Sequence, residues 1–144
     1  MLTTATHQKI LLVDDSPDGL LVRKKLLEEL GCEVHVAPNG EEGLRLFESD
    51  TFDVVVTDYR MPRMDGKELI QRIRRQNPQA RIVLVSRFIE SLGLSEESTG
   101  ADVVIEKTSN EALHLVRSVR RLLNRAAERK PAASQRRALA RANR

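Results

Sequence analysis

The sequence has few of the features that cross-link a chain, anchor it in a membrane or direct it out of the cell. Cys32 is the only cysteine, which excludes an internal disulfide. The longest apolar runs, Ile10 to Val13 and Val54 to Val56, fall far short of the roughly 20 residues that a membrane span requires. The stretch from Met1 to Lys9 is polar and has no apolar segment typical of a secretory signal. We therefore expect a cytoplasmic protein without membrane insertion.

The chain also lacks internal repeats, and its 144 residues suit one domain of ordinary size with no second catalytic domain. Its net charge of +3 conceals an uneven distribution. Residues 1–116 carry 14 Lys and Arg against 20 Asp and Glu, a balance of −6. Residues 117–144 carry 10 Lys and Arg against Glu128 alone, a balance of +9. The body of the protein is acidic and its C-terminal end is basic.

Short apolar runs alternate along the chain with segments of helical periodicity. The predicted strands cover residues 10–13, 33–37, 52–57, 81–86 and 102–106. The predicted helices cover residues 17–30, 39–47, 67–76 and, with the strongest pattern, 108 to a stop near 130. Between the last two strands, residues 88–100 favour only a short or frayed fourth helix. This alternation predicts an α/β protein built from βα units in a parallel sheet.

Capping residues mark three of the predicted helix starts. Ser16 is placed to cap the first helix. Asn39 with Glu42, and Thr108 with Glu111, have the spacing of capping boxes.

Charged and hydroxyl side chains stand where the apolar strands end. The first strand ends in Asp14 and Asp15, the third in Asp58, the fourth in Ser86 and the fifth in Lys107. A strand buried on both faces is a poor place for a charge, so Asp58 is expected at the carboxyl end of its strand. Ligands of open parallel sheets bind at that edge. If the strands are parallel neighbours, all five groups converge there.

This set of groups suits phosphate chemistry. Crowded carboxylates raise one another's pKa unless a positive group joins them, and a divalent cation together with Lys107 supplies that charge. Oxygen ligands with room for water suit Mg²⁺. A carboxylate beside Mg²⁺ and an ammonium group is equipped to attack phosphorus, which would form an acyl phosphate on Asp58. Ser86 has a hydroxyl to donate to a phosphoryl oxygen.

Residues 9 to about 127 resemble the receiver domain of bacterial two-component response regulators, the chemotaxis-type fold, with every motif in the family's order. The resemblance implies a flavodoxin-like, doubly wound, five-stranded parallel sheet of order 2-1-3-4-5 with helices on both faces. It also implies that Asp58 is the phosphoacceptor, that Ser86 is the switch hydroxyl and that Lys107 binds phosphate. The implied Mg²⁺ ligands are Asp15, Asp58 and the backbone carbonyl of Arg60, with Asp14 acting through water.

Three positions depart from the family's pattern. Thr108 replaces the proline that usually follows the lysine in a cis peptide bond, so we expect a trans bond here. Val104 stands where the family usually has an aromatic side chain that takes part in switching. Arg87 replaces a small residue and is placed either to cover the phosphate or to obstruct a phosphatase. These departures fall on the family's usual output surface.

The resemblance implies a single-domain response regulator that receives phosphoryl from a histidine kinase or a phosphotransfer protein. It would act as a switch of partner binding rather than as an enzyme, and the sequence does not indicate its downstream partner. The expected parts are a disordered leader over 1–8, the receiver domain over 9–130 and a basic, disordered tail over 131–144. An aspartyl-phosphate phosphatase fits worse, because it needs a second acid where Arg60 stands.

Two other functions remain open. The three departures favour a binding module that acts without phosphorylation. The basic end favours a nucleic-acid-associated regulator, held by phosphate contacts rather than by base sequence because no aromatic residues interleave with its arginines.

Simpler interpretations also remain for single features. Asp14 and Asp15 fit the solvated end of a strand. Asp58 fits a residue that caps a turn, and Ser86 fits a hydrogen-bond partner of a backbone group. Arg60 fits a solvated loop residue, and Tyr59 a packing or surface position. The basic stripe on the last helix, which fits a solvated face, consists of Arg117, Arg121, Arg125 and Arg129. The histidines lack ligand spacing and are expected to be structural or exposed; they are His7, His35 and His114.

Overall fold

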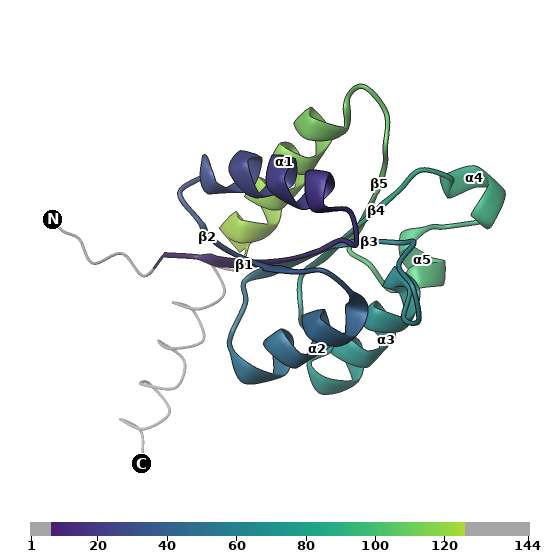
Figure 1. The fold of residues 1–144 in the computed structure, drawn as a ribbon, viewed down its shortest axis with the longest axis horizontal. Helices are drawn as coiled ribbons and strands as arrows, with labels where there is room; N and C mark the ends of the chain where they lie inside the picture. The colour runs from purple at the N-terminus through teal and green to yellow at the C-terminus, as the bar shows by residue number, and fades with distance from the viewer. Residues whose placement is uncertain (1–6, 126–144) are drawn as a thin grey trace, which may run out of the picture.

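The computed structural model describes residues 7–125, which form a single parallel sheet covered by helices (Figure 1). The strands are β1 (Lys9–Val13), β2 (Glu33–Ala37), β3 (Val54–Asp58), β4 (Ile82–Ser86) and β5 (Val103–Glu106). All four strand pairings are parallel, and the order across the sheet is β2-β1-β3-β4-β5. The predicted fold and strand order are confirmed.

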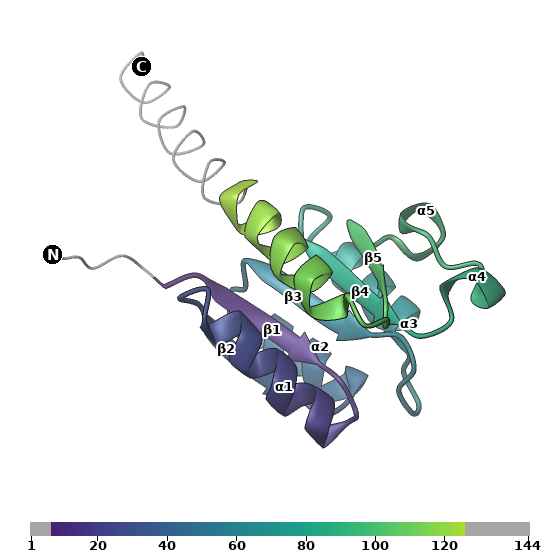
Figure 2. The same cartoon turned by 90° about the horizontal axis from the view of Figure 1, so that it is seen from above.

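Helices cover both faces of this sheet. They are α1 (Pro17–Glu28), α2 (Gly40–Ser49), α3 (Gly66–Gln76), α4 (Ile89–Leu92), α5 (Glu96–Thr99) and a last helix whose described part is 111–125. Helix α1 and the last helix lie on one face, and α2 and α3 lie on the other (Figures 1 and 2). The end of the last helix and the predicted tail over 131–144 lie outside the described residues, as does most of the predicted leader.

The alternation of side chains along each strand divides the core into two layers. In β1, Ile10 and Leu12 join the apolar cluster beneath α1 and the last helix, whereas Leu11 and Val13 join the cluster beneath α2 and α3. All four side chains are buried. Because both faces of the central strands are covered, β3 can be a run of valines without any polar alternation.

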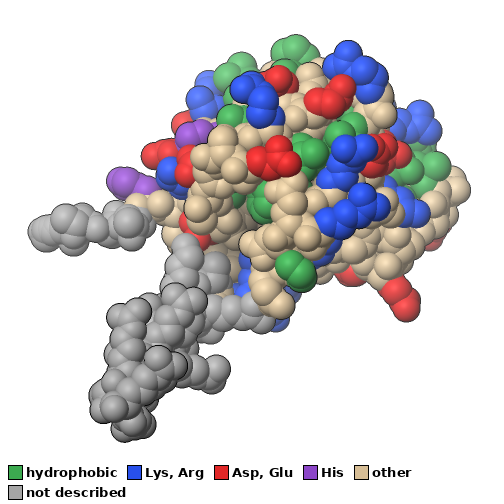
Figure 3. Space-filling model, turned by 90° about the horizontal axis from the view of Figure 1, so that it is seen from below, with side chains coloured by type: hydrophobic (Ala, Val, Ile, Leu, Met, Phe, Trp, Pro, Cys, Tyr) green, Lys and Arg blue, Asp and Glu red, His purple; other side chains and the backbone are tan. Residues whose placement is uncertain are grey.

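The outer surface on the side of α2 and α3 carries both signs of charge, with Lys and Arg interspersed among Asp and Glu (Figure 3). Ion pairs within single helices account for part of this pattern, since Arg45 pairs with Glu42 and Arg72 pairs with Glu68. Exposed pairs of this kind contribute little to stability. Within residues 7–125, no helix combines the length and apolar character needed to cross a bilayer.

Two of the predicted helix caps are present, and one is wrong. The side chain of Ser16 accepts from Gly19 N, and that of Asn39 accepts from Glu42 N. The predicted capping box of the last helix does not form: Thr108 Oγ1 accepts from Asn110 N, and the helix begins at 111. The Glu111 carboxylate pairs instead with a side chain of α1.

The connection between β4 and β5 holds two single-turn helices instead of one frayed helix. Gly93 ends α4 with a positive φ of 62°, a backbone conformation that favours glycine. Ser95 then starts α5, with a reciprocal capping box to Ser98. The helix propensity of the segment is low, but Gly93 at the end of α4 and the capping box at the start of α5 satisfy part of its backbone groups.

Candidate functional site

Asp58 is the last residue of β3 and lies buried at the carboxyl edge of the sheet, with 7% of its surface exposed. The strand register brings the other strand ends to this edge, because Val13 is paired with Thr57 and Ser86 with Glu106. Lys107 follows β5 directly, and its Nζ lies 2.8 Å from Asp58 Oδ1. The predicted convergence of the third and fifth strand ends is therefore present in the fold.

Burial raises the pKa of the Asp58 carboxyl above its ordinary value, because a buried carboxylate loses the stabilisation that water gives its charge. The hydrogen bond and the charge of Lys107 act in the opposite direction, and Asp14 adds a smaller repulsion. On balance, the negative charge of Asp58 is stabilised less in the folded protein than it would be in water.

Three carboxylates meet at this edge. Asp14, Asp15 and Asp58 each place one ligand atom within 4.8 Å of the others'. Asp14 is almost fully buried, with 1% exposed, whereas Asp15 reaches solvent. Oxygen donors at this spacing, open to water on one side, fit a hard divalent cation such as Mg²⁺.

An open cavity of about 310 Å³ lies above these groups. Its lining includes five of the predicted site residues, with Asp14 buried beside them, and consists of Asp15, Ser16, Asp58, Arg60, Ser86, Arg87, Phe88 and Lys107. Ser86 Oγ accepts a long hydrogen bond of 3.4 Å from Phe88 N. The hydroxyl hydrogen of Ser86 thus has room to turn toward a group bound in the cavity.

The lining of the cavity also includes three side chains from the loops after β3 and β4, which are Arg60, Arg87 and Phe88. Arg60 is exposed, and its Cζ lies 5.5 Å from the centre of the Phe88 ring, within cation–π distance. Arg87 also lines the cavity, and its contact with a phosphate stays a prediction. Arg60, Phe88 and Arg87 therefore share one cavity with Asp58.

The departures from the family's pattern have clear structural correlates. Every peptide bond within the described residues is trans, so the bond between Lys107 and Thr108 is trans as expected. Lys107 N donates to Ser86 O at 2.8 Å, which fixes the lysine backbone to the end of β4. Val104 is partly buried and packs against the core beneath α2 and α3.

Arg23 belongs to the site and was missed by the sequence interpretation. This residue of α1 is buried, with 7% exposed, and its guanidinium pairs with Asp14 and with Glu111. A usable signal was present, because Arg23 stands three residues after Leu20 and four before Leu27 on the apolar stripe of α1. A cation on a buried stripe needs an anionic partner.

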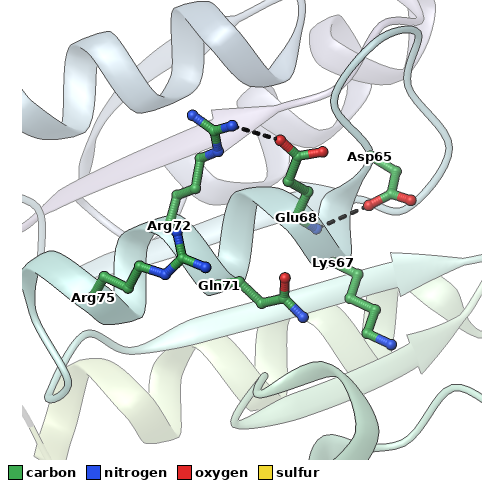
Figure 4. Close-up of a pocket in the computed structure, with 6 residues that line it drawn as sticks. All are labelled: Asp65, Lys67, Glu68, Gln71, Arg72 and Arg75. Carbon is green, nitrogen blue, oxygen red and sulfur yellow. Dashed lines mark hydrogen bonds and ion pairs between the residues drawn. The ribbon is translucent and has the colours of Figure 1, made fainter.

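A larger hollow of about 490 Å³ lies on the outer surface of α3 (Figure 4). Its lining residues come from α3 and its cap and are Asp65, Lys67, Glu68, Gln71, Arg72 and Arg75. Two of them are occupied with local contacts, since Arg72 pairs with Glu68 at 2.9 Å and Asp65 caps the helix (Figure 4). This hollow contains none of the strand-end groups, so the smaller cavity is the candidate site.

The remaining candidate residues take ordinary structural positions. Tyr59 packs against the core beneath α2 and α3. His35 pairs with Glu33 and stacks edge-on with Phe52. Among residues 7–125, no histidine belongs to a group spaced to hold a metal ion.

Comparison with known proteins establishes the family. Residues 10–120 match the response regulator receiver domain, and the chain belongs to that family. The gliding motility regulatory protein of Myxococcus xanthus is 33% identical over 108 residues, which cover 72% of this chain and 14% of that protein. The two-component response regulator ORR42 of Oryza sativa subsp. japonica is 30% identical over 126 residues, which cover 85% of this chain and 95% of that protein.

Solved structures agree with this assignment. The response regulator protein TrrA of Thermotoga maritima, solved in complex with Mg²⁺-BeF, is 35% identical with a TM-score of 0.72, covering 80% of this chain and 98% of that one. A CheY-like receiver domain protein of Methanospirillum hungatei is 27% identical with a TM-score of 0.78, covering 86% and 99%. The predicted receiver family is confirmed, and its relatives include two-component response regulators, whereas the chemotaxis-type subclass stays a prediction.

Several curated relatives are longer than this chain, which spans 14%, 34% and 56% of the lengths of three of them. Sensor histidine kinases also appear among the relatives, for example GacS of Pseudomonas protegens, 39% identical over 66 residues that cover 46% of this chain and 7% of that protein. The comparisons do not favour a phosphorylation-independent binding module or a nucleic-acid-associated regulator.

Proposed function

We propose that this protein is a phosphoacceptor response regulator in which Asp58 accepts a phosphoryl group from a histidine kinase or a histidine phosphotransfer protein. The observation that carries the proposal is the ion pair between Lys107 and Asp58 beside two further carboxylates, at the open edge of a receiver sheet. A buried, paired carboxylate at the base of a cavity is a nucleophile held in one position.

Each residue has a defined task in the transfer. An oxygen of Asp58 attacks the phosphorus of a phosphohistidine, a P–O bond forms, and the P–N bond breaks. The imidazole nitrogen of the donor keeps the electron pair of that bond and takes up a proton. The ammonium group of Lys107 offsets charge on the phosphoryl oxygens, and the hydroxyl of Ser86 donates to one of them.

In this proposal Asp15, Asp58 and the backbone carbonyl of Arg60 would hold Mg²⁺, and Asp14 would act through water. When bound, Mg²⁺ supplies positive charge that stabilises the phosphoryl oxygens in the transition state. The spacing of the three carboxylates and the exposed position of Asp15 support this assignment, because one side of the cluster is open to water.

The protein acts in this proposal as a switch and turns over no substrate other than its own phosphoryl group. Histidine kinases take their phosphoryl group from ATP. We therefore propose that this protein acts in the cytoplasm. Its downstream partner in this proposal is a protein that distinguishes the phosphorylated from the unphosphorylated chain. The proposed receiver domain occupies residues 9–130.

Acetyl phosphate and beryllofluoride with Mg²⁺ provide the test. With either reagent, the wild-type protein should show spectral changes around Asp58, and acetyl phosphate should add one phosphoryl group by mass spectrometry. Asp58→Ala should show neither response. Asp18→Ala is the matched control, because Asp18 is an exposed carboxylate in the first turn of α1, outside the cavity lining. Equal responses from the wild type and Asp58→Ala would contradict the proposal.

Phosphotransfer from a panel of histidine kinases then tests the partner. We expect one or a few kinases to label the wild-type protein much faster than the others and none to label Asp58→Ala. Uniformly slow labelling by all of them would count against a dedicated kinase.

A further inference from the structure

Arg23 forms a buried bridge between the acidic site and the start of the last helix. Its Nη1 donates to Asp14 Oδ2, and its Nε donates to Glu111 Oε2 at 2.7 Å. The side chains of Arg23 and Asp14 are 9% and 1% exposed, so this contact is shielded from water. One guanidinium therefore connects a carboxylate of the proposed metal site to a helix on the same face of the sheet.

The sequence of α1 makes room for this bridge at Gly19. A Cβ at that position would lie 2.5 Å from Asp14 Oδ2 and 3.0 Å from Arg23 Nη1, so any larger residue would collide with the ion pair. Gly19 has an ordinary helical backbone and no positive φ. The space it leaves is occupied by the contact between Asp14 and Arg23.

The charge of Arg23 is secure despite its burial. Burial lowers the pKa of Arg23, but the hydrogen bond and charge of Glu111, with further contributions from Asp14 and Asp58, raise it on balance. The guanidinium is consequently a permanent cation beside the carboxylate cluster.

Both oxygens of Asp14 already accept hydrogen bonds from the protein. Oδ1 accepts from Ser16 N at 3.0 Å, and Oδ2 accepts from Arg23. A metal ion that uses Asp14 must share it with the guanidinium, and two cations at one carboxylate repel each other strongly in a low-dielectric site. Glu111 draws the same guanidinium toward the last helix and partly neutralises it.

We propose that Arg23 is a positioning residue that competes with Mg²⁺ for Asp14, and that Glu111 weakens this competition by holding the guanidinium from the other side. This inference rests on the proposed function, since it concerns the same metal site. It gives the protein a built-in limit on Mg²⁺ affinity, set by residues outside the cavity lining.

The proposal predicts opposite effects for the two partners of the bridge. Arg23→Met removes the competing cation and keeps most of the side-chain length, so the affinity for Mg²⁺ should rise by about tenfold or more. Glu111→Gln leaves the full charge of Arg23 on Asp14, so the affinity should fall severalfold. In the double variant the effect of Glu111→Gln should disappear, because Glu111 acts only through Arg23.

Mg²⁺ titration of the full-length, EDTA-treated protein provides the measurement, by calorimetry and by the fluorescence of Tyr59. Tyr59 is the only tyrosine, the chain has no tryptophan, and this residue directly follows Asp58. Arg72→Met is the matched control, because it removes an equal charge from an exposed pair on α3. Its affinity should stay within about twofold of the wild type.

Thermal unfolding gives a second readout that does not depend on measured affinity. Arg23→Met leaves Asp14 as a buried charge without its cation, so its Tm without metal should be lower than that of the wild type. Saturating Mg²⁺ should then raise the Tm of Arg23→Met by more than it raises that of the wild type. If Arg23→Met does not fold, Glu111→Gln still tests the proposal, because it retains Arg23.

An unchanged or lower Mg²⁺ affinity in Arg23→Met would overturn the inference, as would a Glu111→Gln effect that persists in the double variant. These results leave the proposed function standing as long as Mg²⁺ binds the wild type and Asp58 is phosphorylated. Failure of the wild type to bind Mg²⁺, or labelling of Asp58→Ala, would instead overturn the proposed function.

Discussion

The ammonium group of Lys107 lies 2.8 Å from Oδ1 of Asp58, although β4 separates their strands in the sheet. The backbone of Lys107 is held to β4 through its hydrogen bond to Ser86 O, and its side chain reaches across β4 to the end of β3. Lys107 therefore contacts two other residues of the proposed site, Ser86 through its backbone and Asp58 through its side chain.

Replacing Lys107 by Met should slow phosphoryl transfer to Asp58 on the order of a hundredfold, because a preorganised cation is lost where charge develops. The rate of adduct formation with acetyl phosphate, followed by mass spectrometry, measures this. Lys67→Met is the control, since Lys67 lines the separate hollow on α3 and should leave the rate unchanged. A similar loss in both variants would mean that overall charge, and not the contact with Asp58, sets the rate.

The raised pKa of Asp58 has a defined consequence for stability without metal. The folded protein holds the Asp58 proton more tightly than the unfolded chain, whose pKa lies near 3.8, because burial disfavours the charged form. Stability from this group is therefore greatest below pH 3.8 and falls as the pH rises through the raised pKa. Asp58→Asn has no carboxyl at this position and does not lose this stability. The Tm of Asp58→Asn minus the Tm of the wild type should therefore increase as the pH rises from acid to neutral.

Thermal unfolding in EDTA over that pH range tests the sign. Asp65→Asn is a useful comparison, because Asp65 is a helix-capping carboxylate outside the cavity. A difference between Asp58→Asn and the wild type that is constant with pH would show that burial of Asp58 does not disfavour its charge.

The sequence predicts the sheet well because its signals are local. A run such as that of β3, covered on both faces, has no alternation, and its first charged residue marks the end of the strand. The order of strand-end groups then identifies the edge that carries Asp58. The bounds of the strands differ from the prediction by one or two residues. For example, the third strand was predicted to begin at Phe52, whereas β3 begins at Val54.

Features that depend on contacts between distant elements could not be predicted in the same way. Glu111 has the spacing of a capping box with Thr108, yet its carboxylate is taken by Arg23, 88 residues earlier in the chain. Arg60 interacts with Phe88 only because the loops after β3 and β4 meet at one edge. Tertiary partners override local preferences where a buried charge needs a counterion.

Gly66 should tolerate no side chain, because it approaches the backbone of Asp58. A Cβ at this position would lie 2.4 Å from the carbonyl oxygen of Asp58 and 2.9 Å from Tyr59 Cα. Backbone atoms cannot move aside as a flexible side chain does, so Gly66→Ala should lose about 1 to 3 kcal/mol of unfolding free energy. Denaturant unfolding measures the loss, and the adjacent variant Lys67→Ala should lose much less. Equal stability of the two variants would contradict the close approach.

Arg60 and Phe88 should lengthen the lifetime of the phosphorylated state by covering the cavity. The Cζ of Arg60 stands 5.5 Å from the centre of the Phe88 ring, and both residues line the cavity above Asp58. Arg60→Ala removes this cover and keeps the backbone carbonyl, so water should reach the acyl phosphate more easily and hydrolyse it a fewfold faster. The decay of the phosphoryl adduct after removal of acetyl phosphate measures the lifetime. Arg63→Ala is the control, because Arg63 lies on the same loop but pairs with Glu41 away from the cavity lining. Equal lifetimes for Arg60→Ala and the wild type would show that the pair does not limit access of water.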